Sequence, residues 1–173
     1  MSSEIERKFK VKKVPQEILD TIKPLELVQT YLEAPEGQER RVRAINNEKF
    51  VVTVKIPKVS SNGLIREELE KEITKEDYEL FLSQQKGTQI KKKRYKVPAD
   101  NDLTYEVDIY EDELEGLLVV EVEFPTEELA NNFEAPDWFG KEVTDNKAYK
   151  NASLAMHGLP ADEAPKRGSN IDR

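Results

Sequence analysis

The chain has 173 residues, which suits one compact domain, and 37% of them are hydrophobic while 36% are charged. Its 27 Lys and Arg residues against 35 Asp and Glu give a net charge of -8, which argues against a general nucleic-acid-binding protein. The lack of cysteine excludes disulfides, zinc fingers and thiol catalysis, and the single histidine, His157, excludes a multi-histidine metal site.

Eight segments have the composition of β-strands, with β-branched or aromatic residues between turn residues. They are residues 3–11, 25–33, 39–46, 48–57, 64–73, 89–97, 103–111 and 116–124. Asn46-Asn47 and Ser61-Asn62-Gly63 predict tight hairpin turns, because asparagine and glycine tolerate positive φ. The expected fold is therefore β-rich (α+β), with most neighbouring strands antiparallel.

Four helices are expected between or after these strands. The first covers residues 15–22. Thr74 caps a helix over 75–86 that ends at Gly87, and Thr126 opens one over 127–134. Asp145 opens a helix through residue 157 that ends at Gly158. Residues 159–173 are polar, contain two prolines and predict a disordered tail, which leaves residues 1–158 as the single folded domain.

Eight antiparallel strands with few helices favour a closed barrel flanked by helices. At this strand number a barrel holds either packed side chains or one small ligand. The side chains that point inward decide between these two contents.

Charged residues gather on one face of strand after strand, because positions i and i+2 of a strand share a face. In the first strand, for example, Glu6 and Lys8 lie opposite Ile5 and Phe9. The bases on these faces are Lys8, Arg41, Arg43, Lys55, Arg66, Lys92 and Arg94, and the acids are Glu4, Glu6, Glu68, Glu70, Glu106, Asp108, Glu121 and Glu123.

Two arrangements explain this pattern. In one, an ordinary amphipathic sheet turns its charged face to water. In the other, the apolar faces point outward beneath the helices and the charged faces line a cavity. Paired carboxylates in such a cavity suit Mg²⁺ or Mn²⁺, and Lys and Arg suit phosphate oxygens. The second arrangement contains the groups that phosphoryl transfer requires.

Residues 4–9, Glu-Ile-Glu-Arg-Lys-Phe, carry an ExExK pattern that resembles the signature of the CYTH superfamily, the triphosphate tunnel metalloenzymes. The resemblance covers about residues 3–156 and is nearest to the small bacterial inorganic triphosphatases. It continues in order through Tyr31-Leu32, Arg41-Val42-Arg43, Thr53-Val54-Lys55, Arg66-x-Glu68-x-Glu70, Lys92-x-Arg94, Glu106-Val107-Asp108, Glu121-Val122-Glu123, Trp138-Phe139-Gly140 and Tyr149-Lys150-Asn151.

The resemblance implies an eight-stranded antiparallel tunnel that binds a triphosphate with a divalent metal ion. The implied metal ligands are Glu4, Glu6, Glu121 and Glu123, with Glu68, Glu70 and Asp108 beside a second ion. The implied phosphate-binding residues are Lys8, Arg41, Arg43, Lys55, Arg66, Lys92 and Arg94. Tyr31 and Lys92 are the implied catalytic residues, although a tyrosine pKa of about 10 makes a poor base at neutral pH. A carboxylate or a metal-bound water is the alternative base.

The segment after residue 144 resembles the helix that plugs the tunnel in this superfamily and sends a basic residue to the substrate. Here the stretch reads Asp145-Asn146-Lys147-Ala148-Tyr149, with Ala148 where an arginine is often found. We therefore expect Lys147 to supply the charge.

The function expected from this resemblance is metal-dependent hydrolysis of inorganic tripolyphosphate, with nucleoside triphosphates as further substrates and Mg²⁺ or Mn²⁺ as cofactor. Two alternatives stay open: a class IV adenylate cyclase, or a polyphosphate-binding module without turnover. We expect no nucleic-acid or membrane partner, and a homodimer is compatible with the sequence. No apolar run approaches about 18 residues, and the first residues lack a signal-peptide core, so a cytoplasmic location is expected.

Overall fold

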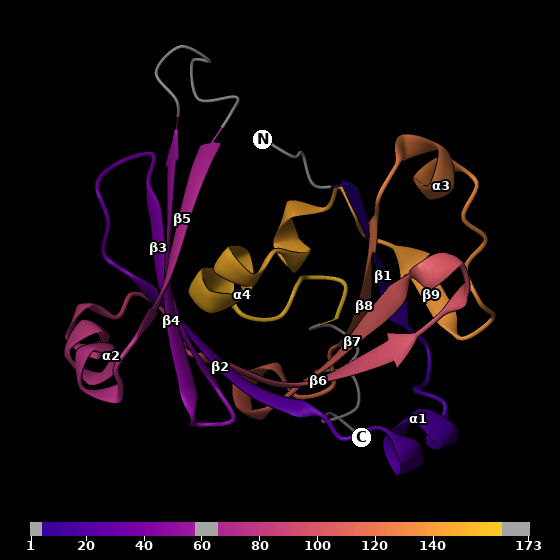
Figure 1. Cartoon of the computed structure of the whole chain (residues 1–173), viewed down its shortest axis with the longest axis horizontal. Helices are drawn as coiled ribbons and strands as arrows, with labels where there is room; N and C mark the ends of the chain where they lie inside the picture. The colour runs from indigo at the N-terminus through magenta and orange to yellow at the C-terminus, as the bar shows by residue number, and fades with distance from the viewer. Residues whose placement is uncertain (1–4, 58–65, 164–173) are drawn as a thin grey trace.

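The strands form one antiparallel sheet that curves around a short helix, α4 (Figure 1). The computed structural model describes residues 5–57 and 66–163, with Arg66 described by its backbone alone. The strands are β1 (Ile5–Val11), β2 (Leu25–Leu32), β3 (Glu39–Ile45), β4 (Lys49–Pro57), β5 (Arg66–Ile73), β6 (Ile90–Pro98), β7 (Thr104–Tyr110), β8 (Leu118–Phe124) and β9 (Phe139–Glu142). The helices are α1 (Gln16–Thr21), α2 (Lys75–Phe81), α3 (Glu127–Asn131) and α4 (Asn151–His157).

The eight predicted strands are found where the sequence places them, but the predicted closure into a barrel is not confirmed. The order across the sheet is β5-β4-β3-β2-β6-β7-β8-β1-β9, so within the described ranges the hydrogen-bonded ladder ends at β5 and at β9. The short strand β9 was not predicted. It pairs with β1 through Phe9↔Glu142 and Val11↔Phe139. The result is a β-rich fold with one large antiparallel sheet and a few helices.

Several predicted turns and caps are confirmed by the backbone. Asn46 and Asn47 both have φ of 53° in the β3–β4 hairpin. The side chain of Thr74 accepts a hydrogen bond from the Asp77 amide at 3.1 Å and so caps α2. Thr126 caps α3 in the same way. The other predicted hairpin turn, residues 61–63, lies outside the described residues.

The helix expected over residues 145–157 is shorter than predicted. Asn146 accepts a hydrogen bond from the Ala148 amide at 3.0 Å, and residues 147–149 form a 3-10 turn. Lys150 then has extended backbone angles, φ -73° and ψ 142°, and α4 begins only at Asn151. Because an asparagine side chain competes for backbone amides, it stops the helix from extending toward Asp145.

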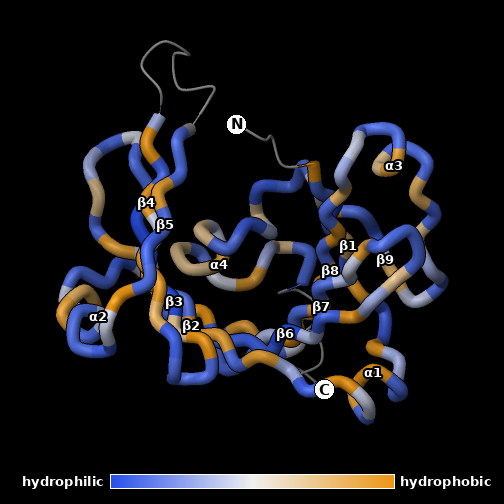
Figure 2. The backbone as a smooth tube through the Cα atoms, in the orientation of Figure 1, coloured by the Kyte–Doolittle hydropathy of each residue, from blue (hydrophilic) through white to orange (hydrophobic). Residues whose placement is uncertain are grey.

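The apolar faces of the strands point outward and are covered by helices. Phe9, Val107, Val120 and Val122 belong to a cluster beside α1 and α3, and a second cluster under α2 includes Val42, Ala44, Phe50 and Tyr78. Figure 2 shows how hydrophilic and hydrophobic positions follow one another along the strands. The charged residues of the same strands are therefore left on the concave face. This is the second of the two arrangements compatible with the sequence.

The concave face has a small apolar core of its own at one end, where α4 packs. Tyr149 and Leu154 are each 1% exposed there, and Tyr110 belongs to the same cluster. The Tyr149 hydroxyl donates a hydrogen bond to Asp162 at 2.7 Å, and Lys10 forms ion pairs with Asp162 and Glu163. The first part of the predicted tail, through Glu163, is thus a turn packed beside α4, and residues 164–173 lie outside the described residues.

Gly87, in the connection before β6, lies against the C-terminal end of α4. Its φ is +75°, and a Cβ atom there would lie 2.6 Å from the carbonyl oxygen of Ala155. The neighbouring Thr88 amide donates a hydrogen bond to that same oxygen at 2.8 Å. At Gly87 the connection that leads into β6 therefore lies directly against the backbone of α4.

We expect Gly87→Ala to lower the free energy of unfolding by more than the ~1 kcal/mol of a strained backbone angle, because the new methyl group also collides with α4. Urea unfolding followed by circular dichroism measures the loss. Gly116→Ala is the matched control, since Gly116 also has a positive φ, +98°, with no atom within 4 Å of the added Cβ. Equal losses in the two variants would contradict the close approach.

Candidate active site

A cavity of about 440 Å³ occupies the concave face next to the start of α4. Its lining is dominated by charge, with six cations and four carboxylates. The residues that line it are Glu6, Lys8, Tyr31, Glu39, Arg41, Arg43, Lys55, Glu68, Arg94, Glu121, Lys150, Asn151 and Ala152. They come from β1, β2, β3, β4, β5, β6, β8 and α4, so the curvature of the sheet brings together residues far apart in sequence.

Most of the residues selected from the sequence meet in this cavity, and some do not. Those found in its lining are Glu6, Lys8, Tyr31, Arg41, Arg43, Lys55, Glu68, Arg94 and Glu121. Glu70 instead accepts a hydrogen bond from Thr53 at 3.3 Å, and Glu123 lines a neighbouring cavity of about 530 Å³ with Glu106. Glu4 and the Arg66 side chain lie outside the described residues.

The basic residue that the α4 segment brings to the cavity is Lys150, where the sequence predicted Lys147. Lys147 is exposed and does not line the cavity. Lys150 and Asn151 do line it. The reason is the late start of α4, which turns the 3-10 segment around Lys147 away. The run Tyr149-Lys150-Asn151 was noticed in the sequence, but without the helix boundary no signal distinguished Lys150 from Lys147.

Carboxylates lie between the cations of the cavity. Glu39 lies 3.2 Å from Arg41 and 4.0 Å from Lys55, and Glu68 lies 3.9 Å from Arg41. On the other side, Lys8 lies 3.9 Å from Glu121. Glu39 was not predicted as a site residue, although its position two residues before Arg41 places it on the same face of β3.

Arg94 in the cavity wall forms a buried group of charges with Lys92 and Asp108, which lie behind it. Asp108 accepts hydrogen bonds from Arg94 at 2.8 and 3.0 Å, and its Oδ2 lies 2.8 Å from the Lys92 ammonium. Burial lowers the pKa of Lys92 to about 8, although Asp108 opposes this shift. Burial alone would raise the pKa of Asp108, but Lys92 and Arg94 outweigh it and bring that pKa to about 2.

This geometry gives Asp108 a different place from the one that the sequence suggested, beside a second metal ion. Both its oxygens are engaged by cations, its side chain is 7% exposed, and it is absent from the cavity lining. The register explains the difference, because Asp108 lies directly opposite Arg94 in the β6–β7 ladder. Lys92, 1% exposed, pairs with the same carboxylate and is likewise absent from the cavity lining.

Tyr31 reaches the cavity from β2 and is 5% exposed. Burial raises its pKa, and this effect outweighs the opposing influence of Arg41 and the hydrogen bond from Gln29. The phenol therefore keeps its proton at neutral pH. A neutral hydroxyl donates and accepts hydrogen bonds, and does not act as a strong base.

The carboxylates at the cavity offer the hard oxygen donors that Mg²⁺ and Mn²⁺ prefer. Glu6 on β1 lies directly opposite Glu123 on β8, so the ladder brings two carboxylates side by side. Within residues 5–57 and 66–163, no cluster of three metal-binding side chains is found, and Glu4 lies outside that range. The chemistry of the donors still fits a divalent ion, which Glu6 and Glu121 of this cavity and Glu123 beside Glu6 would hold, although the three do not form a cluster in the structure.

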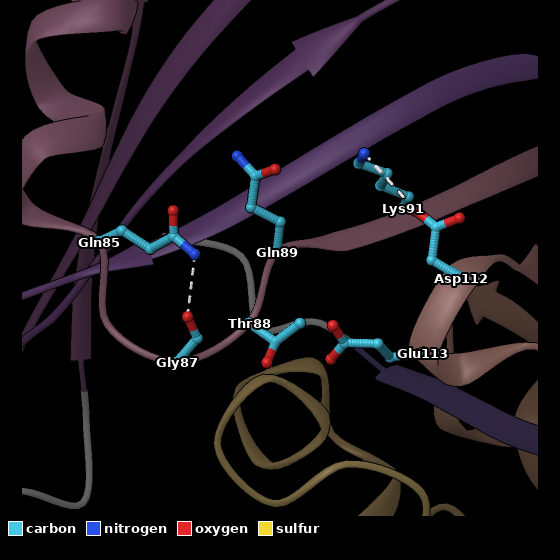
Figure 3. Close-up of a pocket in the computed structure, with 7 residues that line it drawn as sticks. All are labelled: Gln85, Gly87, Thr88, Gln89, Lys91, Asp112 and Glu113. Atoms are coloured by element: carbon cyan, nitrogen blue, oxygen red, sulfur yellow. Dashed lines mark hydrogen bonds and ion pairs between the residues drawn. The ribbon is translucent and has the colours of Figure 1, made fainter.

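A third cavity, of about 300 Å³, lies beside the connection that leads into β6 (Figure 3). The amide of Gln85 donates a hydrogen bond to the Gly87 carbonyl at 2.9 Å, and Lys91 lies 3.5 Å from Asp112. With Lys91 as its one cation against Asp112 and Glu113, its lining does not favour a polyanion. The cavity of about 440 Å³, with its six cations, is therefore the candidate active site.

Known proteins resemble this chain over most of its length. The CYTH domain model matches residues 2–156. An inorganic triphosphatase of Nitrosomonas europaea is 38% identical over 155 residues, which is 89% of this chain and 97% of that protein. One of Acetivibrio thermocellus is 34% identical over 158 residues, 91% of this chain and 96% of that protein.

Among solved structures, the crystal structure of the inorganic triphosphatase NE1496 has a TM-score of 0.71 at 32% identity, and covers 92% of this chain and 99% of that one. None of the helices in the described part of the chain is both long and apolar enough to span a membrane.

Proposed function

The chain belongs to the CYTH domain family, and from this premise we propose that it is a divalent-metal-dependent triphosphatase that hydrolyses inorganic tripolyphosphate to pyrophosphate and phosphate. The observation that carries the proposal is the cavity in which six cations and four carboxylates meet. The relatives named inorganic triphosphatase support it. Nucleoside triphosphates present the same chain of phosphates and are further substrates.

The cations of the cavity bind the phosphate chain. Arg41 and Arg43 project from β3, Lys55 from β4 and Arg94 from β6, and all of them line the cavity. A guanidinium matches two phosphate oxygens at once, whereas Lys55 and Lys8 act as point charges. Asp108 holds Arg94 in place by two hydrogen bonds, so this cation needs little further ordering when the substrate arrives. These strands enclose the phosphate chain as the walls of a tunnel would.

In the reaction, a water oxygen attacks the terminal phosphorus, the bond from that phosphorus to the bridging oxygen breaks, and pyrophosphate leaves with the bonding electrons. The positive side chains stabilise the charge that spreads over the transferred group. The proton of the water passes to a carboxylate of the cavity wall, because Tyr31, with its raised pKa, retains its own proton.

The metal ion that the family implies is placed with Glu6, Glu121 and Glu123, together with Glu4, and we name Mg²⁺ or Mn²⁺ on the chemistry of these donors. When bound, such an ion neutralises phosphate charge and orients the phosphate oxygens. Glu68, which lines the same cavity, and Glu70 are the carboxylates available to a second ion.

Phosphate release from tripolyphosphate, ATP and pyrophosphate, each with Mg²⁺, Mn²⁺ or EDTA, tests the proposed function. We expect release from tripolyphosphate that EDTA abolishes and that exceeds release from ATP. Cyclic AMP formed from ATP would favour a cyclase instead. Tight binding of tripolyphosphate without any release would indicate a binding module.

The cytoplasmic location and the homodimer remain predictions from the sequence.

A further inference from the structure

A fully buried amide, Gln29, connects two residues of the cavity wall. Gln29 is 0% exposed and lies on the concave face of β2, two residues before Tyr31 and directly opposite Arg43 on β3. Its Oε1 accepts hydrogen bonds from Arg43 at 3.0 and 2.7 Å, and its Nε2 donates one to the Tyr31 hydroxyl oxygen at 2.9 Å. Gln29 has no place in the cavity lining itself, so any effect on the substrate passes through its two neighbours.

The orientation of this amide follows from its surroundings. The guanidinium of Arg43 has donors only, so the atom of Gln29 that faces it must be the oxygen. The amide nitrogen then necessarily faces Tyr31, and the phenolic oxygen must accept. A glutamine in this position therefore sets the direction of the hydrogen bond to Tyr31.

For Tyr31, this direction determines where its own proton can go. Its oxygen accepts from Gln29, the nearby Arg41 can only donate as well, and among the described residues no group is found that accepts a hydrogen bond from its O–H. Because Tyr31 lines the cavity, the hydroxyl hydrogen is available to an acceptor inside it, such as a phosphate oxygen. Tyr31 would therefore donate a hydrogen bond to a phosphate chain in the cavity, and a donor is the partner that an anion needs.

For Arg43, the important feature is that its partner is neutral. Arg94, the comparable arginine on β6, is held by the carboxylate of Asp108, which cancels much of its charge. Arg43 is also held by two hydrogen bonds, but its acceptor is a single amide oxygen that carries no charge. Its full positive charge is therefore available to an anionic ligand, although burial and the nearby Arg94 and Arg41 lower its pKa from the usual value.

We propose that Gln29 is a positioning residue of the triphosphatase site, which holds Arg43 without neutralising it and commits the Tyr31 hydroxyl to donate a hydrogen bond to the substrate. The proposal rests on the proposed function. It separates two effects of one side chain: the Arg43 contact governs substrate capture, and the Tyr31 contact governs the chemical step.

Gln29→Glu tests both effects, because glutamate has the same shape and still accepts from Arg43, but adds a charge and cannot donate to Tyr31. We expect KM for tripolyphosphate to rise roughly 10-fold and kcat to fall roughly 10- to 100-fold. In a Tyr31→Phe background, the same substitution should still raise KM but change kcat by less than about 2-fold, since no hydroxyl remains to misdirect. A kcat loss of equal size in both backgrounds, or wild-type kinetics in Gln29→Glu, would overturn the proposal.

Gln89→Glu is the matched control. Gln89 donates a hydrogen bond to Thr30 at 3.1 Å and lies outside the candidate active site, so it makes the same change of charge without touching Arg43 or Tyr31. We expect kcat and KM to stay within about 2-fold of the wild-type values. A loss as large as that of Gln29→Glu would show that added charge alone explains the kinetics, and would overturn the proposal.

A second measurement needs neither activity nor a folded Gln29 variant. The side-chain amide of Gln29 gives a ¹⁵N–¹H₂ pair in the NMR spectrum, assignable through its contacts with Arg43 and Tyr31. Tyr31→Phe should shift this pair, because the accepting oxygen is lost, and an unmoved pair would overturn the proposal. If the pair shifts but the wild-type protein releases no phosphate from tripolyphosphate, the proposed function fails while the assigned hydrogen bond stands.

Discussion

Replacing Asp108 by asparagine is expected to lower the free energy of unfolding by about 3–5 kcal/mol, the usual cost of leaving buried charge uncompensated. The substitution keeps the shape of the side chain but removes the one negative charge between Lys92 and Arg94, both of which contact its oxygens. Urea unfolding at pH 7 measures the loss. The phosphatase rate should fall as well, because Arg94 lines the cavity and loses its fixed orientation.

Asp112→Asn is the control for Asp108→Asn. Asp112 also pairs with a lysine, Lys91 at 3.5 Å, but both side chains are exposed, and exposed pairs contribute only about 0–1 kcal/mol. Adding Lys92→Met to Asp108→Asn should recover part of the lost stability, since it removes one of the two buried cations that have lost their counter-charge. Equal, small losses for the two asparagine variants would show that the charge group is not buried as described.

The same carboxylate predicts how stability depends on pH. The pKa of Asp108 is about 2 in the folded protein, below its ordinary value of 3.8. A depressed carboxyl pKa means that the unfolded chain binds the proton more readily. The contribution of Asp108 is therefore complete above about pH 5 and is lost as the pH falls toward 2. In Asp108→Asn, acid unfolding should begin from a lower stability and show a shallower slope in this window.

Glu6→Gln is expected to reduce metal-dependent phosphate release from tripolyphosphate by roughly 1000-fold or more, because it removes a charged ligand from the proposed metal site. Glu6 lines the cavity and lies directly opposite Glu123 on the neighbouring strand. The apparent metal requirement should rise at the same time, which a titration with Mn²⁺ at saturating substrate measures.

Glu72→Gln is the matched control for Glu6→Gln, since Glu72 is an exposed glutamate of β5 that lies 4.0 Å from Lys49 and outside the cavity. Its activity and metal requirement should match those of the wild type. If Glu6→Gln also kept its activity and metal requirement, Glu6 would not be a metal ligand.

The strands and the orientation of their faces were predictable because they depend on local, repeating properties. Alternation along β1 places Glu6 and Lys8 opposite Ile5 and Phe9, whatever the strand pairs with. The sequence left open whether the charged face meets water or a cavity, since alternation is the same in both cases. The apolar clusters beside α1, α3 and α2 decide this, and they depend on how distant helices pack.

The parts that could not be predicted depend on register and on helix boundaries. Asp108 and Glu106 look equivalent in sequence, but only the pairing of β6 with β7 shows that Asp108 is directly opposite Arg94 and closed off behind it. Gln29 carries no charge and so attracts no attention until Arg43 is found across from it. The same is true of Lys150, whose position depends on where α4 begins.

Whether the sheet closes into a barrel could not be predicted from local sequence patterns either. A count of strands suggests a barrel, but closure requires hydrogen bonds between the two outermost strands. Within the described residues, these strands are β5 and β9, and the second of them is a four-residue segment that no alternation marked.

The carboxylates that lie among the cavity cations have a further consequence. Glu39 contacts both Arg41 and Lys55, and Glu68 contacts Arg41, so the protein without substrate supplies its own counter-ions. An incoming anion must displace several of these carboxylates together, as a solute displaces the counter-ions already bound to an ion-exchange resin. A single phosphate group has too little charge to compete with this set, whereas a chain of phosphates displaces the carboxylates at several cations at once. We expect product retention to be weak for the same reason, because the carboxylates return to the cations as the shortened chain leaves.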